Sequence, residues 1–188
     1  ASDKIFVAAG NLSGSANIRF AVVRYGNVIG SRGSVIPFMR ELISKGAASL
    51  PITDTRMTRF WITLNQGVQF VLSCMGLARG GEIFVPKIPS MRIVDLAKAL
   101  APDLPHHVVG IRPGEKLHEV MVTEDDARST LELDDRYIIE PSFHWWSRRS
   151  FVEDGAKRVA ADLRYASDTN TQWLDAARLR SMLAEPAS

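Results

Sequence analysis

The sequence predicts an α/β protein built around a mainly parallel sheet, and three observations lead to that class. A continuous apolar run at Phe20–Val23 is typical of a strand buried on both faces. Residues 35–43 follow with apolar side chains at the spacing of one helix face. The same order of strand and helix returns at Glu82–Val85 and 93–100. Strands that alternate with helices predict parallel pairing.

The first fifty residues divide into a helix, that strand and a second helix. Residues 1–9 are compatible with a helix that enters without a capping residue, and Gly10–Gly14 ends it. Pro37 stands in the first turn of the second helix, where its missing N–H costs little. Gly46 is a natural terminator for the second helix.

Short strands and one long helix are expected between residues 49 and 85. Ser49–Ile52 and Phe60–Ile62 predict two extended segments. Thr63 followed by Gln66 has the spacing of a capping box, which predicts a helix start. We expect one face of that helix to be apolar and to carry Leu64, Val68, Val71, Leu72 and Met75.

The pattern weakens toward the C-terminus. His107–Ile111 and Tyr137–Ile139 are further strand candidates. The acidic run Glu124–Asp126 predicts solvated surface or a turn, and residues 141–172 are mixed and loop-like. A terminal helix is predicted from the spacing of Leu174, Ala177, Arg178 and Met182.

Composition excludes several classes of protein. Hydrophobic residues make up 46% and charged residues 23% of 188 residues, which is globular rather than disordered. The net charge of +2 indicates no nucleic-acid footprint, and no apolar run approaches the ~20 residues of a membrane span. One cysteine, Cys74, excludes an intrachain disulfide and a cysteine-based zinc site. We therefore expect no metal site, a packing or surface role for Cys74, and the cytoplasm as location.

The loop at Arg24–Ser34 is the first candidate site. It follows the predicted buried strand and precedes a helix, and ligands of open α/β sheets bind beyond the carboxyl ends of strands. Its glycines allow close approach of backbone amides, Asn27 offers a neutral donor and acceptor, and Arg32 offers a cation suited to phosphate. The alternative is a tight turn with solvated arginines, and spacing alone does not separate the two.

The second candidate is the turn at Gly110–Lys116, which also follows a predicted strand. Its Pro and Gly residues stiffen the turn and hold Arg112 and Glu115 three residues apart. Such a pair could bind a diphosphate through the guanidinium and a ribose diol through the carboxylate. The alternative, slightly favoured by spacing alone, is a surface turn with a weak ion pair.

Taken together, these segments resemble the inverting UDP-N-acetylglucosamine 4,6-dehydratases, a family of extended short-chain dehydrogenases/reductases that act on nucleotide sugars. The resemblance covers nearly the whole chain, and only residues 142–164 match loosely. The matching segments are Arg24–Ser34, Pro51–Asp54, Met57–Trp61, Gly80–Met91, Asp95–Pro102, Gly110–His118 and Tyr165–Leu174.

The resemblance implies roles for individual residues. Those expected at the nicotinamide end of NADP are Val28, Ile29, Gly30, Ser31 and Arg32. Those expected to bind the UDP-sugar are Asn27, Val35, Thr53, Arg112 and Glu115. Arg56 and Arg59 could assist a diphosphate, but we favour surface or structural roles for both.

The resemblance also implies that part of the enzyme is missing. Family members carry a βαβ unit with a glycine-rich cofactor fingerprint and a Tyr-x-x-x-Lys helix for proton transfer, and neither pattern stands in this sequence. We therefore expect the catalytic residues upstream of residue 1. Residues 1–141 would be the C-terminal strands of a Rossmann-like fold with its substrate-binding subdomain. Residues 142–188 would be a C-terminal extension with the terminal helix.

The implied reaction is dehydration of UDP-N-acetylglucosamine to a UDP 4-keto-6-deoxy amino sugar, inverted at C5, for polysaccharide or flagellin-type glycans. Family members imply a homo-oligomer for the full-length protein. One alternative is the retaining 4,6-dehydratase branch or another nucleotide-sugar epimerase or reductase. Another is a non-catalytic module that binds a UDP-sugar or oligomerises. The segments Pro86–Met91 and Asp168–Leu174 favour the inverting branch.

Overall fold

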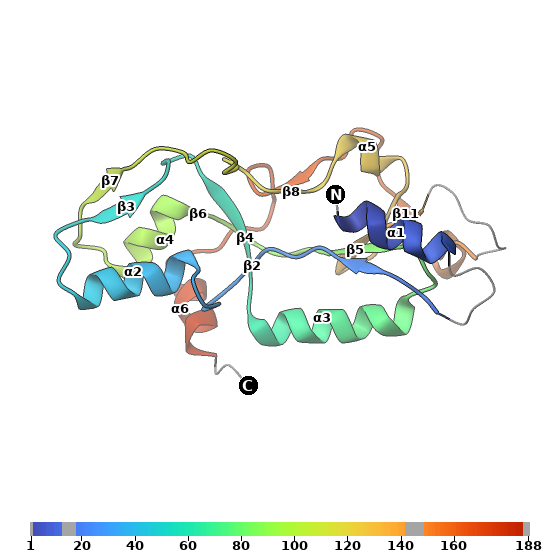
Figure 1. The fold of residues 1–188 in the computed structure, drawn as a ribbon, viewed down its shortest axis with the longest axis horizontal. Coiled ribbons are helices and arrows are strands. Elements are labelled where there is room, and N and C mark those ends of the chain that lie inside the picture. Colours follow the sequence, from blue (N-terminus) through green and yellow to red (C-terminus); the bar gives the residue numbers. More distant parts are fainter. Residues whose placement is uncertain (1, 13–17, 142–148, 186–188) are drawn as a thin grey trace. The chain divides into compact units, whose positions relative to one another are not determined.

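The computed structural model describes residues 2–12, 18–141 and 149–185 (Figure 1). The chain divides into two compact units, each built from segments far apart in the sequence. Unit 1 consists of Ala1–Tyr25, Val68–Lys87 and Met121–Tyr165, and unit 2 of Gly26–Gly67, Ile88–Val120 and Ala166–Ser188. The boundary expected after residue 141 falls within unit 1, and the tail beyond it contributes to both units. The separate C-terminal extension stays a prediction.

Unit 1 is organised around a five-stranded mixed sheet. The strands, in their order across the sheet, are β1 (Val22–Val23), β5 (Ile83–Pro86), β10 (Arg136–Ile139), β9 (Thr130–Glu132) and β11 (Lys157–Arg158). The β1–β5 pair is parallel, with Val22 opposite Ile83, and the other three pairs are antiparallel. The helical elements with residues in this unit are α1 (Ser2–Leu12), α3 (Leu64–Leu77), α5 (Glu124–Ala127) and the 3₁₀ turn at Phe151–Asp154.

Two expectations for unit 1 are corrected. The Phe20–Val23 strand forms only at Val22–Val23 and is half-buried rather than buried on both faces. The apolar face expected on α3 is largely exposed, with Leu72 at 54% and Met75 at 70%. The opposite face is the buried one, because Phe70 and Cys74 pack with Phe84 of β5. Because α3 has apolar residues on two faces, its packing against the sheet decides which face is buried.

Other expectations for unit 1 are confirmed. The helix expected at 1–9 is α1, although its expected end at Gly10–Gly14 lies partly outside the described residues. The strands expected at Glu82–Val85 and Tyr137–Ile139 are β5 and β10. The acidic run at 124–126, expected as solvated surface or a turn, is exposed at Glu124 and Asp125 but forms a short helix, because Thr123 and Asp126 make a reciprocal capping box.

The described residues of unit 2 form two small sheets and three complete helices. One sheet has the order β2 (Asn27–Val28), β4 (Thr58–Ile62) and β6 (Ser90–Arg92), and the other pairs β3 (Leu50–Ile52) with β7 (His106–Val108) in parallel. The helices are α2 (Val35–Ser44), α4 (Ile93–Leu100) and α6 (Ala176–Ala184). The two remaining strands of the described chain are β8 (Val120–Val122) and β12 (Tyr165–Ala166).

The core of unit 2 joins its helices to its strands. Fully buried Ile36 of α2, Leu96 of α4 and Leu179 of α6 belong to one apolar cluster with Trp61 of β4 and Leu50 of β3. The spacing predicted for residues 35–43 is only partly confirmed: Met39 of that stripe is buried, but Phe38 of the same stripe is 46% exposed, and Ile36, outside it, is fully buried. The capping box of Thr63 and Gln66 is confirmed, since each backbone N–H donates to the other's side chain at 3.1 and 3.2 Å. The α/β class is therefore confirmed, with antiparallel pairs alongside the expected parallel ones.

Among the described residues, none of the helices combines the length and the apolar character that a membrane span needs.

Candidate functional site

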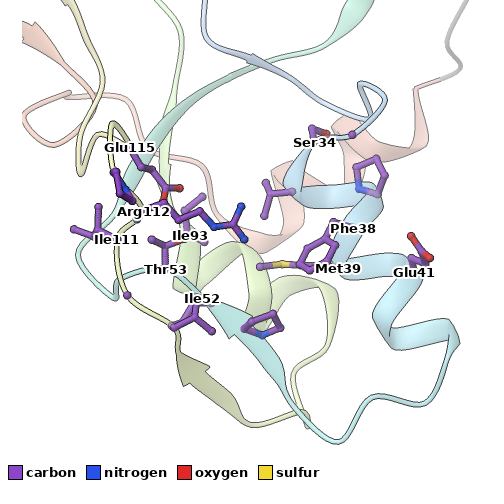
Figure 2. A pocket seen from close by; sticks show the side chains of 17 residues that line it. Ser34, Phe38, Met39, Glu41, Ile52, Thr53, Ile93, Ile111, Arg112 and Glu115 are labelled. Atoms are coloured by element: carbon purple, nitrogen blue, oxygen red, sulfur yellow. The ribbon is translucent and has the colours of Figure 1, made fainter.

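Unit 2 contains a pocket of about 850 Å³ at the carboxyl ends of two parallel strands. Its wall is formed by the start of α2, the segment after β3 and the turn after β7 (Figure 2). Val35, Thr53, Arg112 and Glu115, four of the five residues expected to bind substrate, line this pocket. The volume is in the range of small-molecule sites. The arrangement is the one expected for ligands of α/β sheets, beyond the carboxyl ends of strands.

The start of α2 supplies one side of the pocket. Gly33 has φ +76°, a left-handed conformation that favours glycine, and Ser34 precedes the helix in an extended conformation. The Ser34 hydroxyl oxygen is buried and has no hydrogen-bond partner among the described residues. Helix N-termini favour anions through their free N–H groups, so this end of α2 suits a negatively charged ligand.

The segment after β3 supplies Thr53. The β3–β7 pairing continues past the strands, because Val109 N–H donates to Ile52 O at 2.9 Å and Gly110 N–H to Thr53 O at 3.2 Å. These bonds hold the base of the turn at 110–116 against Thr53. The backbone therefore fixes Thr53 beside the turn that carries Arg112.

The Arg112–Glu115 turn is closed by its own backbone. Glu115 N–H donates to Arg112 O at 3.0 Å, and Arg112 N–H donates to Glu115 Oε2 at 3.2 Å. Gly114 has φ +81°, which the turn requires and which other residues rarely adopt. The Glu115 carboxylate thus binds the backbone of Arg112 and not its guanidinium. Across the described part of the chain, the Arg112 guanidinium has no ion pair.

Figure 2 shows the Arg112 side chain reaching from its turn toward α2, with the Glu115 carboxylate beside it and Thr53 below. Apolar side chains cover much of the remaining wall, among them Phe38 and Met39 of α2 and Ile93 of α4. The helical patterns over residues 35–43 and 93–100 predict packing and do not mark these three residues as part of a ligand site. Met39 and Ile93 are buried, whereas Phe38 is 46% exposed, and nothing in the sequence separates the three from other apolar helix residues.

Arg56 and Arg59 have structural partners. Asp54 accepts from the backbone N–H of Arg56 at 2.8 Å and from its Nε and Nη2 at 3.0 and 2.8 Å. These hydrogen bonds hold the pKa of Asp54 at about 2. The Arg59 guanidinium donates to the carbonyl groups of Thr58, Lys116 and Leu117 at 2.7, 2.7 and 3.1 Å. Arg59 thus fastens the end of the Arg112 turn to β4.

The residues expected to contact the cofactor lie on β2 and the turn after it. Val28 pairs with Ile62, and Ile29 N–H donates to Ile62 O at 2.9 Å. The turn that follows is exposed at Gly30–Arg32, and Gly30 has φ +76°. These five residues lead directly into Gly33 and Ser34 at the pocket wall.

Asn27 lies at the start of β2, opposite Trp61, and is half-buried. It is not among the residues that line the pocket. Gly26, just before it, touches β4 so closely that an added Cβ would lie 2.5 Å from Phe60 Cβ. Only glycine therefore allows this approach, which fixes the position of Asn27.

The chain is similar in sequence to several known proteins. A profile of the polysaccharide biosynthesis protein family matches residues 1–141. A UDP-N-acetylglucosamine 4,6-dehydratase (inverting) from Campylobacter jejuni is 56% identical over 179 residues, which cover 92% of this chain and 53% of that protein. A UDP-glucose 4-epimerase from Rickettsia canadensis is 34% identical over 185 residues, 96% of this chain and 54% of the epimerase.

Among solved structures, the X-ray structure of Pen from Bacillus thuringiensis matches with a TM-score of 0.80 and 32% identity. The match covers 97% of this chain and 54% of that one. The chain therefore spans about half the length of the relatives it matches. These matches show that the chain belongs to the polysaccharide biosynthesis protein family, with the α/β fold of the extended short-chain dehydrogenases/reductases.

Proposed function

We propose that this chain forms the substrate-binding part of an NADP-dependent UDP-N-acetylglucosamine 4,6-dehydratase that inverts C5. One observation carries the proposal: Val35, Thr53, Arg112 and Glu115 line a single pocket at the carboxyl ends of β3 and β7. The name of the Campylobacter jejuni relatives, at 54–56% identity, supports the dehydratase over the epimerase, whose named relatives are 34% identical.

The geometry suits a nucleotide diphosphate. The Arg112 guanidinium is planar and forms no ion pair with the residues that the structure describes, so it can donate two parallel hydrogen bonds to phosphate oxygens. Glu115 uses Oε2 for the backbone of Arg112, which leaves Oε1 to accept from a ribose hydroxyl. Val35 and Thr53 provide an apolar contact and a hydroxyl on the facing walls.

The segment Val28–Arg32 fits one end of a dinucleotide. Its turn is exposed, and the space where a Cβ of Gly30 would stand is open, so a planar ring can approach the backbone. The sequence holds no glycine-rich fingerprint for the pyrophosphate, so these residues fit the nicotinamide end alone. When bound, NADP would accept the hydride from sugar C4 and return it to C6.

Within that reaction, the residues of this chain bind and orient the sugar nucleotide. Fixing the diphosphate at Arg112 and the ribose at Glu115 holds the sugar in one register against the Asn27 strand. Loss of water across C5–C6 follows because a 4-keto group acidifies the C5 proton. We assign the proton transfers to none of the described residues.

We propose the cytoplasm as the location, since the sequence has one cysteine and so no intrachain disulfide that an oxidising compartment would favour. A homo-oligomer without nucleic-acid or membrane partners stays a prediction.

Calorimetric titration with UDP tests the substrate role. We expect Arg112→Ala to weaken binding about 10- to 100-fold, because a hydrogen bond to a charged group contributes ~1.5–3 kcal/mol. Arg128→Ala, an exposed arginine of unit 1, removes the same charge and should bind UDP as the unchanged chain does. Equal affinity of the Arg112 and Arg128 variants would contradict the proposal.

A further inference from the structure

Behind the Arg112 turn, unit 2 contains a cluster of three polar side chains. Thr58 Oγ1 lies 2.8 Å from His118 Nδ1 and 2.7 Å from Ser167 Oγ. Thr58 is 3% exposed, Ser167 is fully buried, and His118 is half-buried. Buried hydrogen-bonding groups of this kind are costly to leave unpaired, so the cluster specifies one arrangement.

Ser167 joins the cluster to the backbone on both sides. Its hydroxyl donates to Thr58 O at 3.1 Å and accepts from Glu119 N–H at 2.9 Å. Its own N–H donates to Glu119 O at 2.8 Å. Ser167 therefore fastens the chain just after the Arg112 turn to strand β4.

Neighbouring contacts make the same connection. Thr58 N–H donates to Leu117 O at 3.1 Å, and the Glu119 side chain accepts from Phe60 N–H at 2.9 Å. Burial raises the pKa of Glu119 above its ordinary value, and the hydrogen bond from Phe60 and the charge of Arg59 offset only part of that rise. The far end of the turn is thus anchored on β4, as its near end is anchored on Thr53.

Ser167 comes from a different part of the sequence than the other two residues of the cluster. Thr58 and His118 lie in the segment that the family profile matches, whereas Ser167 comes from the tail beyond residue 141. The tail continues along unit 2, where Asn170 Nδ2 donates to Ile88 O and Ser90 Oγ at 2.8 and 3.0 Å. A segment distant in sequence thereby reaches the support of the pocket.

We propose that Thr58, His118 and Ser167 are positioning residues that hold the turn at 110–116 so that Arg112 and Glu115 face the pocket. The inference rests on the proposed function for the identity of the ligand, a nucleoside diphosphate. It adds that the C-terminal tail, through Ser167, determines the affinity of a site it does not itself line. None of the three side chains belongs to the pocket wall.

The test compares variants that keep or remove one hydrogen-bonding atom. Thr58→Val keeps the shape and loses the hydroxyl, whereas Thr58→Ser keeps the hydroxyl. His118→Ala removes the ring nitrogen, whereas His118→Asn carries a polar atom near the position of Nδ1. Ser167→Ala removes the hydroxyl from the tail. Thr130→Val is the matched control, because Thr130 is also buried and hydrogen-bonded, through its hydroxyl to Asp126 O, but in unit 1.

Two quantities are measured: UDP affinity by calorimetry, and hydrogen exchange without ligand in a peptide that begins before Gly110 and ends at His118. We expect Thr58→Val, His118→Ala and Ser167→Ala to weaken UDP binding about tenfold. They should also speed exchange at Gly110, whose amide donates to Thr53 O, and at Glu115, whose amide donates to Arg112 O. Thr58→Ser and His118→Asn should restore both quantities to within about twofold to threefold. Thr130→Val should change neither.

Unchanged exchange and unchanged UDP affinity in Ser167→Ala would overturn the inference. Effects of equal size in Thr58→Ser and Thr58→Val would also overturn it, because they would show a packing role without the hydroxyl. If a variant at buried Thr58 or Ser167 fails to fold, the comparison of His118→Ala with His118→Asn, at a half-buried position, tests the positioning role. Absence of UDP binding by the unchanged chain would overturn the proposed function instead, and exchange of the turn would still decide the positioning role.

Discussion

The two units of this chain differ in how their strands are arranged: unit 1 has one larger sheet, and unit 2 has smaller sheets beside a pocket. In unit 1, a five-stranded sheet packs on α3 through the aromatic residues Phe70, Phe84 and Phe151. In unit 2, short two- and three-stranded sheets leave the ends of β3 and β7 open as a pocket. Every residue expected to contact substrate or cofactor lies in unit 2. Extended pairing thus builds a scaffold, and interrupted pairing leaves backbone and side chains available to a ligand.

The largest effect that would separate the units is expected at Phe84. Its ring is fully buried and meets Phe151 edge to face at 6.3 Å, so Phe84→Ala should cost about 3–5 kcal/mol of unfolding free energy. Cys74 lies in the same cluster, so its reaction with a thiol reagent reports on unit 1. We expect Phe84→Ala to speed that reaction strongly.

The matched variant in unit 2 is Leu96→Ala, which empties a fully buried site and should cost about 2–5 kcal/mol. At equal loss of stability it should expose Cys74 less than Phe84→Ala does. Equal reactivity of Cys74 in the two variants would mean that the two units unfold together, which would contradict their separate roles as scaffold and site.

The next largest effect is expected at Gly26, where unit 2 tolerates no side chain. A Cβ there would lie 2.6 Å from Phe60 O, so Gly26→Ala must push β2 from β4 and should cost about 1–3 kcal/mol in a urea unfolding experiment. Gly67 of α3 has open space around it, and Gly67→Ala should stabilise the helix by up to ~1 kcal/mol. Gly26→Ala with unchanged stability would show that the strand pair is not close-packed.

Much of the fold is visible in the sequence where a periodic pattern is long. Helix α2 and the capping box at Thr63 form as expected, because their signals are local. The three-residue strand β9 and the two-residue β11 were not predicted, since so few residues show no alternation. The buried face of α3 was assigned wrongly, because its pattern offers two apolar faces and only packing against β5 selects one.

The charged residues of the candidate site could be predicted from the sequence, but the hydrogen bonds that hold them in place could not. The Arg112 turn stands out through its proline, glycines and paired charges. That Glu115 binds the backbone of Arg112 depends on a conformation no spacing reveals. Ser167 is 49 residues from His118 and resembles any other serine, so only the fold brings it to Thr58.

A smaller effect is expected in the pH dependence of Cys74 alkylation, which reports how well unit 1 shields this thiol from solvent. Burial raises the pKa of Cys74 to about 11, although Arg136 Nη1 donates to its sulfur at 3.3 Å. The rate of alkylation by iodoacetamide should therefore stay low at pH 8 and keep rising beyond pH 10. An inflection near pH 8.5, the value of a free thiol, would mean that unit 1 opens readily.

The smallest effect is expected at the ion pair between half-buried Asp54 and exposed Arg56, beside the pocket. The pKa of Asp54 is about 2 in the folded chain, below its ordinary 3.8, so the pair stabilises above pH ~4 and loses that contribution as pH falls toward 2. The difference in Tm between the unchanged chain and Arg56→Ala should be small at pH 6 and shrink by pH 2. A difference that does not change with pH would mean that the pair contributes nothing to stability.

The most direct test of the division between scaffold and site is hydrogen exchange of the whole chain with and without UDP-N-acetylglucosamine. We expect slower exchange in peptides that cover residues 33–41, 51–53 and 109–117, all in unit 2, and no change in peptides from β5, β9 and β10. Protection in those strands of unit 1, with none in the peptide that carries Arg112, would contradict the assignment of the site.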